Sequence, residues 1–114
     1  MYKSLETKDF DLYTLSALKD NFSYLLVCKP SNKTLVIDPS ESKPVFEALK
    51  KLGLYLHVII NTHHHPDHTG GNAELKQTFV CKVYGPEKES HLIPSLDLTL
   101  QDGQLFEFEN TSFN

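Results

Sequence analysis

The chain has 114 residues, of which 39% are hydrophobic, and its formal net charge is −4. This length allows one domain with a hydrophobic core. Because the charge is negative and no basic run occurs, nucleic acid and anionic membrane surfaces are not expected as partners. Cys28 and Cys81 each belong to an apolar segment and to no metal-spaced pattern, which predicts buried free thiols and a reducing compartment. With no apolar leader and no segment of membrane-spanning length, we expect a cytoplasmic protein.

The first third of the chain is typical of short strands joined by polar turns. Residues 1–9 are polar, and we expect them to form a loose start. Apolar and β-branched residues favour strands, and they predict strands over residues 10–18, 22–28 and 34–37. Since the connecting turns are short, this part of the sheet is expected to be antiparallel.

Helices and strands alternate in the rest of the chain. Ser42 can cap a helix that begins near Lys43 and that Gly53 closes, because apolar residues recur between them at helical spacing. A central strand over residues 54–60 and a second helix over residues 72–77 follow. Beyond them we expect a strand at 79–84, a turn or short helix at 85–92, and a hairpin joining 97–100 to 105–108. This order predicts an α/β fold with a mixed sheet.

The segment Val58 to Asn72 carries the strongest functional signal. Three β-branched residues, Val58 to Ile60, are typical of a buried strand. Four histidines and one aspartate follow within six positions, and Pro66 excludes a regular helix or inner strand there. The histidines therefore lie on a loop at the carboxyl end of a strand, where open α/β sheets bind their ligands.

Two pairs of metal-binding side chains are present in this loop. His63 and His65 are two positions apart, so in an extended segment both rings can reach one ion. Asp67 and His68 follow the proline and can serve a second ion nearby. Imidazoles with one carboxylate suit zinc, and also iron or manganese. The alternative is a solvated loop that binds metal adventitiously, but the density of ligands after a buried strand favours a dedicated metal site.

Four segments together resemble one known family. The segment THHHPDHTGGN at residues 62–72 resembles the HxHxDH signature of the metallo-β-lactamase superfamily. Within that superfamily the chain is similar to the glyoxalase II enzymes, or hydroxyacylglutathione hydrolases. Its segments ALKDNFSY at 17–24, VIDP at 36–39 and KVYG at 82–85 resemble blocks of that branch and occur in the same order.

The resemblance implies a fold and a set of site residues. The fold would be an αββα sandwich, of which residues 1–114 form one truncated domain: the first half, a mixed sheet with helices on one face, without the second half and the C-terminal helical domain. Two zinc ions would bind, one at His63 and His65 and one at Asp67 and His68, with Asp67 also orienting the catalytic water. Asp38 would orient a ligand histidine or else form a simple Asx–Pro turn, and His64 would point away from the ions and support the loop.

The resemblance also implies an activity and partners. Enzymes of the glyoxalase II branch hydrolyse S-lactoylglutathione to lactate and glutathione. Their metal ions would supply the hydroxide that attacks the thioester. Four of the seven expected metal ligands are present, so we expect little or no activity from this chain alone. The alternatives are a non-catalytic metal-binding or assembly module, a degenerate remnant, and a related thioesterase or lactonase. An uncovered apolar sheet face predicts self-association or pairing with a separate second-half fragment.

Overall fold

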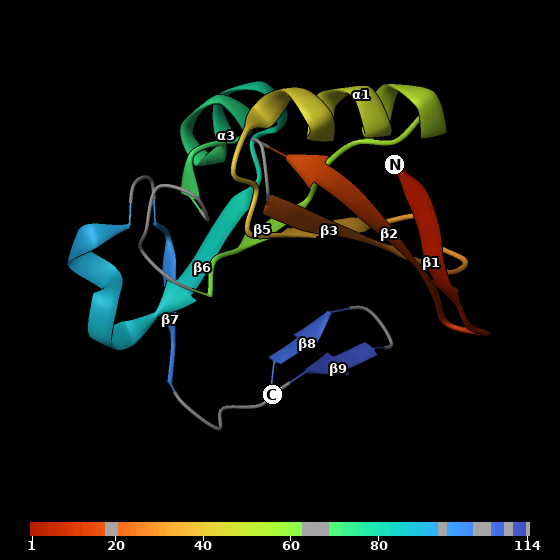
Figure 1. Cartoon of the computed structure of the whole chain (residues 1–114). Coiled ribbons are helices and arrows are strands. Elements are labelled where there is room, and N and C mark those ends of the chain that lie inside the picture. Colours follow the sequence, from red (N-terminus) through yellow and green to blue (C-terminus); the bar gives the residue numbers. More distant parts are fainter. Residues whose placement is uncertain (18–20, 63–68, 94–95, 102–105, 109–110, 114) are drawn as a thin grey trace.

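A seven-stranded mixed sheet forms the centre of the chain in the computed structural model (Figure 1). The structure describes residues 1–17, 21–62, 69–93, 96–101, 106–108 and 111–113. The strands lie in sequence order across this sheet, from β1 at one edge to β7 at the other. Helices α1 and α3 lie on one face, and a separate two-stranded sheet, β8–β9, lies on the opposite side (Figure 1). This confirms the predicted α/β fold with helices on one face of a mixed sheet.

The bounds of the elements are as follows. The strands of the large sheet are β1 (Tyr2–Glu6), β2 (Phe10–Ala17), β3 (Asn21–Cys28), β4 (Thr34–Ile37), β5 (Val58–Ile60), β6 (Lys82–Pro86) and β7 (Leu98–Leu100). The other elements are α1 (Ser42–Leu52), α3 (Asn72–Phe79), a 3₁₀ helix (Glu87–Leu92), β8 (Phe106–Phe108) and β9 (Thr111–Phe113). The 3₁₀ helix confirms the turn or short helix predicted before Leu92.

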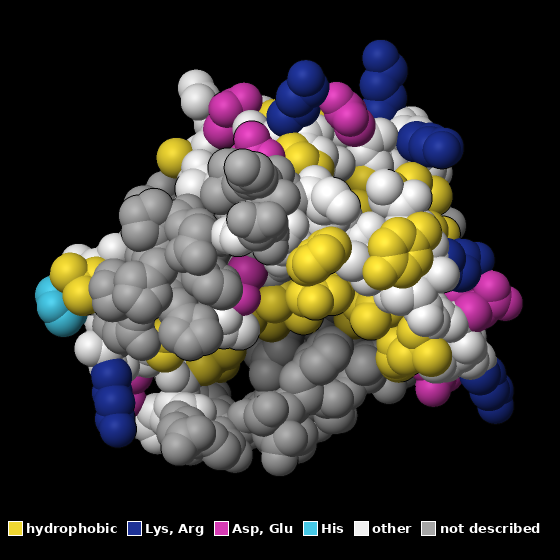
Figure 2. Space-filling model, in the orientation of Figure 1, with side chains coloured by type: hydrophobic (Ala, Val, Ile, Leu, Met, Phe, Trp, Pro, Cys, Tyr) yellow, Lys and Arg dark blue, Asp and Glu magenta, His cyan; other side chains and the backbone are white. Residues whose placement is uncertain are grey.

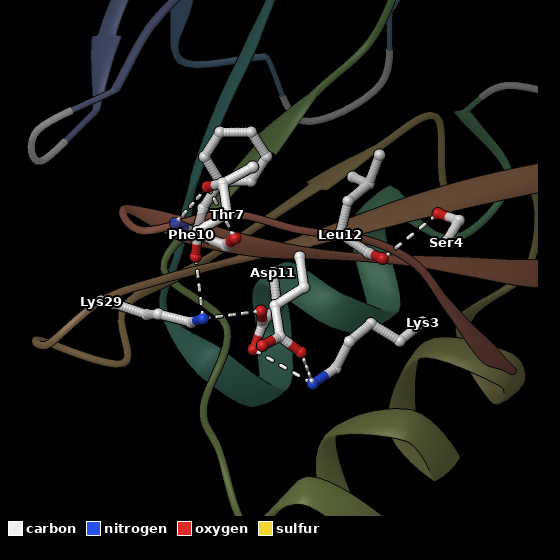
Figure 3. Close-up of polar contacts among 8 residues, drawn as sticks. Lys3, Ser4, Thr7, Phe10, Asp11, Leu12 and Lys29 are labelled. Atoms are coloured by element: carbon white, nitrogen blue, oxygen red, sulfur yellow. Dashed lines mark hydrogen bonds and ion pairs between the residues drawn. The ribbon is translucent and has the colours of Figure 1, made fainter.

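The first four strands form the predicted antiparallel arrangement, but the prediction of a loose start is wrong. Strand β1 pairs with β2 along the edge of the sheet. The Nζ atoms of Lys3 and Lys29 lie 3.5 and 2.9 Å from the carboxylate oxygens of Asp11 and tie β1 and the β3–β4 turn to β2 (Figure 3). The hydrophobic pattern misses β1 because all five of its residues are exposed, so its pairing depends on backbone hydrogen bonds and charge.

Helix α1 begins at Ser42, so its N-cap lies one position earlier than predicted. Glu41 occupies the N-cap with extended backbone angles and no capping side-chain hydrogen bond, so the prediction that Ser42 caps the helix is wrong. Gly53 ends the helix as predicted, because its φ of 71° is a left-handed conformation that glycine adopts without strain. The buried face of α1 consists of Val45, Ala48 and Leu49.

The middle strands are shorter than the sequence predicts. Only Val58–Ile60 of the strand expected over 54–60 pairs in the sheet, between β4 and β6 and parallel to both. Helix α3 continues to Phe79, whose ring packs 5.6 Å from that of Phe46 on α1. Val80 then turns the chain with a φ of 52°. Strand β6 therefore begins at Lys82, three positions after its predicted start.

The predicted final hairpin is wrong in its pairing. Strand β7 pairs in parallel with β6, and β8 pairs antiparallel with β9 in the separate sheet. Alternating apolar residues indicate a strand but leave its partner open. Gln101 follows β7, whereas Asp102 and Gly103 of the predicted turn lie outside the described residues.

Side chains alternate between the two faces of the sheet and form two apolar clusters. On the helix side, Leu25, Val36, Ile59 and Val83 pack with the buried residues of α1 and α3. On the opposite side, a smaller cluster consists of Leu26, Cys28, Leu35 and Val58. Cys28 and Cys81 are both buried thiols outside any disulfide, as predicted. Burial raises the pKa of the Cys81 thiol and keeps it protonated near neutral pH.

None of the helices in the described ranges is both long and apolar enough to cross a membrane. The assignment of residues 1–114 to one truncated domain stays a prediction.

Candidate metal-binding loop

The carboxyl ends of three neighbouring parallel strands lie side by side, and the histidine-rich segment follows the middle strand, β5, in the sequence. Strands β4, β5 and β6 are parallel neighbours, with Ile37 opposite Ile60 and Ile60 opposite Tyr84. Asp38 follows β4 and Asn61 follows β5, so their positions lie side by side at one edge of the sheet. The predicted site residues of the loop itself, His63, His64, His65, Asp67 and His68, lie outside the described residues. Their roles as ligands and as a loop support stay predictions.

Asp38 fixes the residue that immediately precedes the first histidine. Its Oδ1 accepts a hydrogen bond of 2.7 Å from the backbone N–H of Thr62, and its Oδ2 accepts one of 2.5 Å from the Thr62 hydroxyl. The backbone of Asp38 is held as well: its N–H donates to Ile60 O at 2.9 Å, and its carbonyl accepts from Ser23 Oγ at 2.7 Å. The buried carboxylate thus reaches across to the next strand and anchors the start of the loop.

The backbone conformation at position 38 suits an aspartate better than most other residues. Its φ of 51° is left-handed, and aspartate and asparagine tolerate this region better than other non-glycine residues. Both alternatives raised for Asp38, a turn residue and an orienting carboxylate, involve this bend after β4. The contact with Thr62 adds a third role that the sequence did not indicate, and orientation of a ligand histidine stays a prediction.

A buried pair of asparagines closes the loop. Asn61 and Asn72 stand at its two ends and are 2% and 0% exposed. Asn72 Nδ2 donates to Asn61 Oδ1 at 2.5 Å, and Asn61 Nδ2 donates to Asn72 Oδ1 at 3.3 Å. The two amides therefore form a reciprocal pair between the end of β5 and the first turn of α3. Sequence reasoning missed both residues. The available signal was an asparagine directly after a buried strand and another directly after the Gly-Gly pair.

Gly71 brings the far end of the loop against the bend after β4. Its N–H donates to Pro39 O at 2.7 Å. A Cβ at this position would lie 2.9 Å from both Pro39 O and Glu41 C, so only glycine fits here without displacing backbone. Together, the Asp38–Thr62 contact, the asparagine pair and this close approach hold both ends of the loop on one small area of the fold.

The donor set of the loop fits a divalent transition metal. Three imidazoles and one carboxylate, from His63, His65, His68 and Asp67, are the ligand types that zinc, iron and manganese bind. Among the residues that the structure describes, no group of three or more His, Cys, Asp or Glu side chains could hold a metal ion. The assignment of metal binding to the loop stays a prediction.

The histidines outside the loop have other surroundings. His57 Nδ1 accepts a hydrogen bond of 3.2 Å from the N–H of Thr34, at the start of β4. This contact gives His57 a structural role at the start of β4. His91 is exposed in the last turn of the 3₁₀ helix.

Comparison with known proteins agrees with this arrangement. Residues 18–105 match the metallo-beta-lactamase superfamily. The chain is 42% identical over 100 residues to a protein of Pelagibacter ubique named hydroxyacylglutathione hydrolase, covering 88% of this chain and 42% of that protein. A protein of the same name from Rhodospirillum rubrum is 41% identical over 93 residues, covering 82% of this chain and 36% of the relative. The chain thus spans less than half the length of these relatives.

Solved structures show the same fold at lower sequence identity. The metallo-beta-lactamase FEZ-1 of Legionella gormanii superposes with a TM-score of 0.75 at 22% identity, over 89% of this chain and 47% of that one. A structure described as a peroxy diiron species of the chemotaxis sensor ODP gives 0.78 at 18% identity, over 95% of this chain and 48% of the other.

The mixed sheet with two helices on one face defines an α/β fold. The chain belongs to the metallo-beta-lactamase superfamily. Membership implies a divalent metal, and it confirms the family that the sequence motifs indicated.

Proposed function

We propose that this chain carries half of the metal site of a thioester hydrolase of the hydroxyacylglutathione hydrolase type, which converts S-lactoylglutathione into lactate and glutathione. The single observation that carries the proposal is an identity of 41–42% to proteins of that name over 82–88% of this chain. The loop chemistry supports it, because three histidines and an aspartate follow a buried strand in the spacing that metal ligation needs.

The loop residues would divide the ligands between two ions. His63 and His65 would hold one zinc, and Asp67 and His68 the other, with iron or manganese as alternatives. When bound, such ions lower the pKa of a water molecule toward neutrality and polarise the thioester carbonyl. Asp67 is the only carboxylate among residues 61–72, so it would also accept a hydrogen bond from the attacking water and fix the direction of attack.

The described residues around the loop would position these ligands. Metal and catalytic geometry must be held to about half an ångström. The contact of Asp38 with Thr62 fixes the backbone one residue before His63. At the other end, the buried amide of Asn72 fixes the first turn of α3. Because both ends of the loop are held by these contacts, the loop would lose less conformational entropy when metal binds.

One observation favours a second function, a non-catalytic metal-binding or assembly module. The loop offers four ligands, and the described part of the chain adds no further group of three ligand side chains. Four ligands from one loop can bind metal without forming a complete hydrolytic site. We therefore expect weak thioester hydrolysis, or none, from this chain by itself.

Metal content and turnover together test the proposal. The chain is purified without chelators and without a histidine tag, and zinc, iron and manganese are measured per chain by elemental analysis. Thioester loss is followed with S-lactoylglutathione, with an unrelated thioester and a lactone as comparison substrates. His63→Ala and His65→Ala should each lower metal uptake by the ion that these two histidines hold, whereas the exposed His91→Ala serves as a matched control and should leave it unchanged.

Each outcome has a defined meaning. If the chain takes up metal and hydrolyses S-lactoylglutathione, and His65→Ala removes this hydrolysis, the hydrolase is supported. Metal uptake with no turnover of any substrate supports the binding module. Preference for the lactone or the unrelated thioester would replace the proposed substrate with that of another hydrolase. A chain that takes up no metal contradicts both functions.

A further inference from the structure

A buried hydroxyl on β3 stands opposite the bend that follows β4. The antiparallel pairing of β3 with β4 ends at Tyr24 and Ile37, so the next residues outward, Ser23 and Asp38, lie just beyond the last pair. Ser23 is 0% exposed, and its Oγ donates a hydrogen bond of 2.7 Å to the carbonyl of Asp38. A side-chain hydrogen bond thus joins the two strands at the point where their pairing stops.

This hydrogen bond helps to hold Asp38 in an unfavourable backbone conformation. The φ of Asp38 is 51°, and a left-handed conformation carries a steric cost for a residue that has a Cβ atom. Asp38 is held there from two sides. Its N–H donates to Ile60 O on β5 at 2.9 Å, and its carbonyl accepts from Ser23 on β3. The bend is therefore fixed by both neighbouring strands, and one of the two contacts is a side chain that a substitution removes.

The bend directs the Asp38 carboxylate to the start of the histidine segment. Its two oxygens accept hydrogen bonds from the N–H and the hydroxyl of Thr62, at 2.7 and 2.5 Å. Because Thr62 is exposed, the hydrogen bond to the carboxylate protects its N–H against exchange with water. The three residues form a polar relay that runs from β3, through the bend, to the residue before His63.

The inner part of this relay lies inside the fold. Ser23 and Asp38 are both buried, whereas lysine side chains project from the outer parts of the molecule (Figure 2). In the interior, where the dielectric constant is low, hydrogen bonds are electrostatically stronger than in water. Loss of the Ser23 hydroxyl should therefore loosen the bend, and with it the carboxylate that the bend directs.

We propose that Ser23 is a positioning residue for the candidate metal site, and that it acts through Asp38 on Thr62. The link to metal rests on the proposed function, in which His63 is a ligand. Changes to residues that orient metal ligands typically lower metal affinity by about 10- to 100-fold. Ser23 is further removed, because it orients the residue that fixes the start of the segment. We therefore expect Ser23→Ala to lower zinc affinity by about three- to tenfold.

Amide hydrogen exchange of the metal-free full chain, followed by nuclear magnetic resonance, tests the relay independently of metal. Ser23→Ala should speed exchange of the Thr62 N–H by about tenfold, the effect of losing one buried hydrogen bond. Thr34→Val is the matched control. Thr34 is also 0% exposed, and its hydroxyl donates to Tyr55 O at the opposite end of β4. This control should speed exchange of the His57 N–H, which donates to Thr34 O, and should leave Thr62 unchanged.

A second variant determines whether Ser23 acts through the carboxylate. Glycine adopts a left-handed conformation without strain, so Asp38→Gly keeps the bend and removes the carboxylate. Adding Ser23→Ala to Asp38→Gly should then change the exchange of the Thr62 N–H by less than about twofold. Zinc affinity is measured by competition with a chromophoric chelator in the wild type, Ser23→Ala and Thr34→Val. Only Ser23→Ala should weaken it.

The proposal is supported if Ser23→Ala speeds exchange at Thr62, lowers zinc affinity and leaves His57 unchanged, while Thr34→Val shows the reverse pattern of exchange. Equal acceleration at Thr62 and His57 in Ser23→Ala indicates a general loss of stability and overturns the proposal. Unchanged exchange at Thr62, an unchanged zinc affinity, or a full effect of Ser23→Ala in the Asp38→Gly background also overturns it. A wild-type chain that binds no zinc contradicts the proposed function instead, and the exchange pattern alone then decides whether Ser23 positions Thr62.

Discussion

The asparagine pair makes the sharpest prediction about how the loop is held. In Asn72→Ala, both amide hydrogen bonds to Asn61 are lost. Each is worth about 1 kcal/mol net, and removal of one partner in a buried place adds a desolvation cost of about 1 kcal/mol or more. We therefore expect the free energy of unfolding to fall by about 3 kcal/mol, with a similar loss for Asn61→Ala. A change of this size is a large fraction of the stability of a small domain.

A double-mutant cycle isolates the pair from its surroundings. Once one side chain is removed, the second truncation breaks no hydrogen bond within the pair. The double variant Asn61→Ala/Asn72→Ala also leaves no unpaired amide, so it should be destabilised by about 2 kcal/mol, which is about 4 kcal/mol less than the sum of the two single variants. Gln77→Ala, which removes an exposed amide from the same helix, should change the stability by less than about 0.5 kcal/mol.

Urea denaturation followed by circular dichroism measures these differences. Chelator is present so that metal does not stabilise the folded state, and the chain concentration is held constant because association would add stability. Single variants whose losses add within about 0.5 kcal/mol would refute the reciprocal hydrogen bonding on which the magnitude depends.

Three further predictions address the surroundings of the loop and the strained turn. Val80→Gly should raise the free energy of unfolding by about 0.5–1 kcal/mol in thermal denaturation, because Val80 is 89% exposed and left-handed and so loses strain without losing contacts; Val80→Ala should gain less. Gly71→Ala should cost about 2 kcal/mol in urea denaturation, since its Cβ would meet backbone atoms at 2.9 Å; an unchanged midpoint would contradict this. For Asp97, burial raises the pKa but the hydrogen bonds from Lys76 and from the Val83 N–H outweigh it, so the folded-state pKa lies below 3.8. The stabilisation is fully present above the ordinary pKa of 3.8 and is lost as the pH falls through the lower pKa of the folded state. In acid unfolding measurements, the stability difference between wild type and Asp97→Asn should therefore shrink below pH 3.8.

The elements with strong local signals could be predicted from the sequence. The strands after Phe10 and Phe22, the helix that Gly53 ends and the buried strand before Asn61 each combine apolar spacing with a recognisable terminator. The histidine segment lies outside the described residues, so its predicted loop conformation stays a prediction. Motif order then gave the family, which the comparisons confirm.

The errors concern features that depend on tertiary contacts. Strand β1 has five exposed residues and pairs by its backbone and by charge, so its hydrophobic pattern carries no signal. The partner of β7 is chosen by the parallel edge of β6 and by Asp97, whose Oδ2 accepts a hydrogen bond of 2.8 Å from the Val83 N–H. The roles of Asn61 and Asn72 in the site could not be seen either, because eleven positions separate two residues that meet only after the chain has folded.

The sequential order of the large sheet has a consequence for how the protein is made. From β1 to β7 every strand pairs with the strand that precedes it in the chain. As a nascent chain leaves the ribosome, each new strand therefore finds its neighbour already synthesised, and the sheet can grow in one direction without waiting for distant segments. Asn72 reaches Asn61 when α3 emerges, after β5 and before β6 have been made.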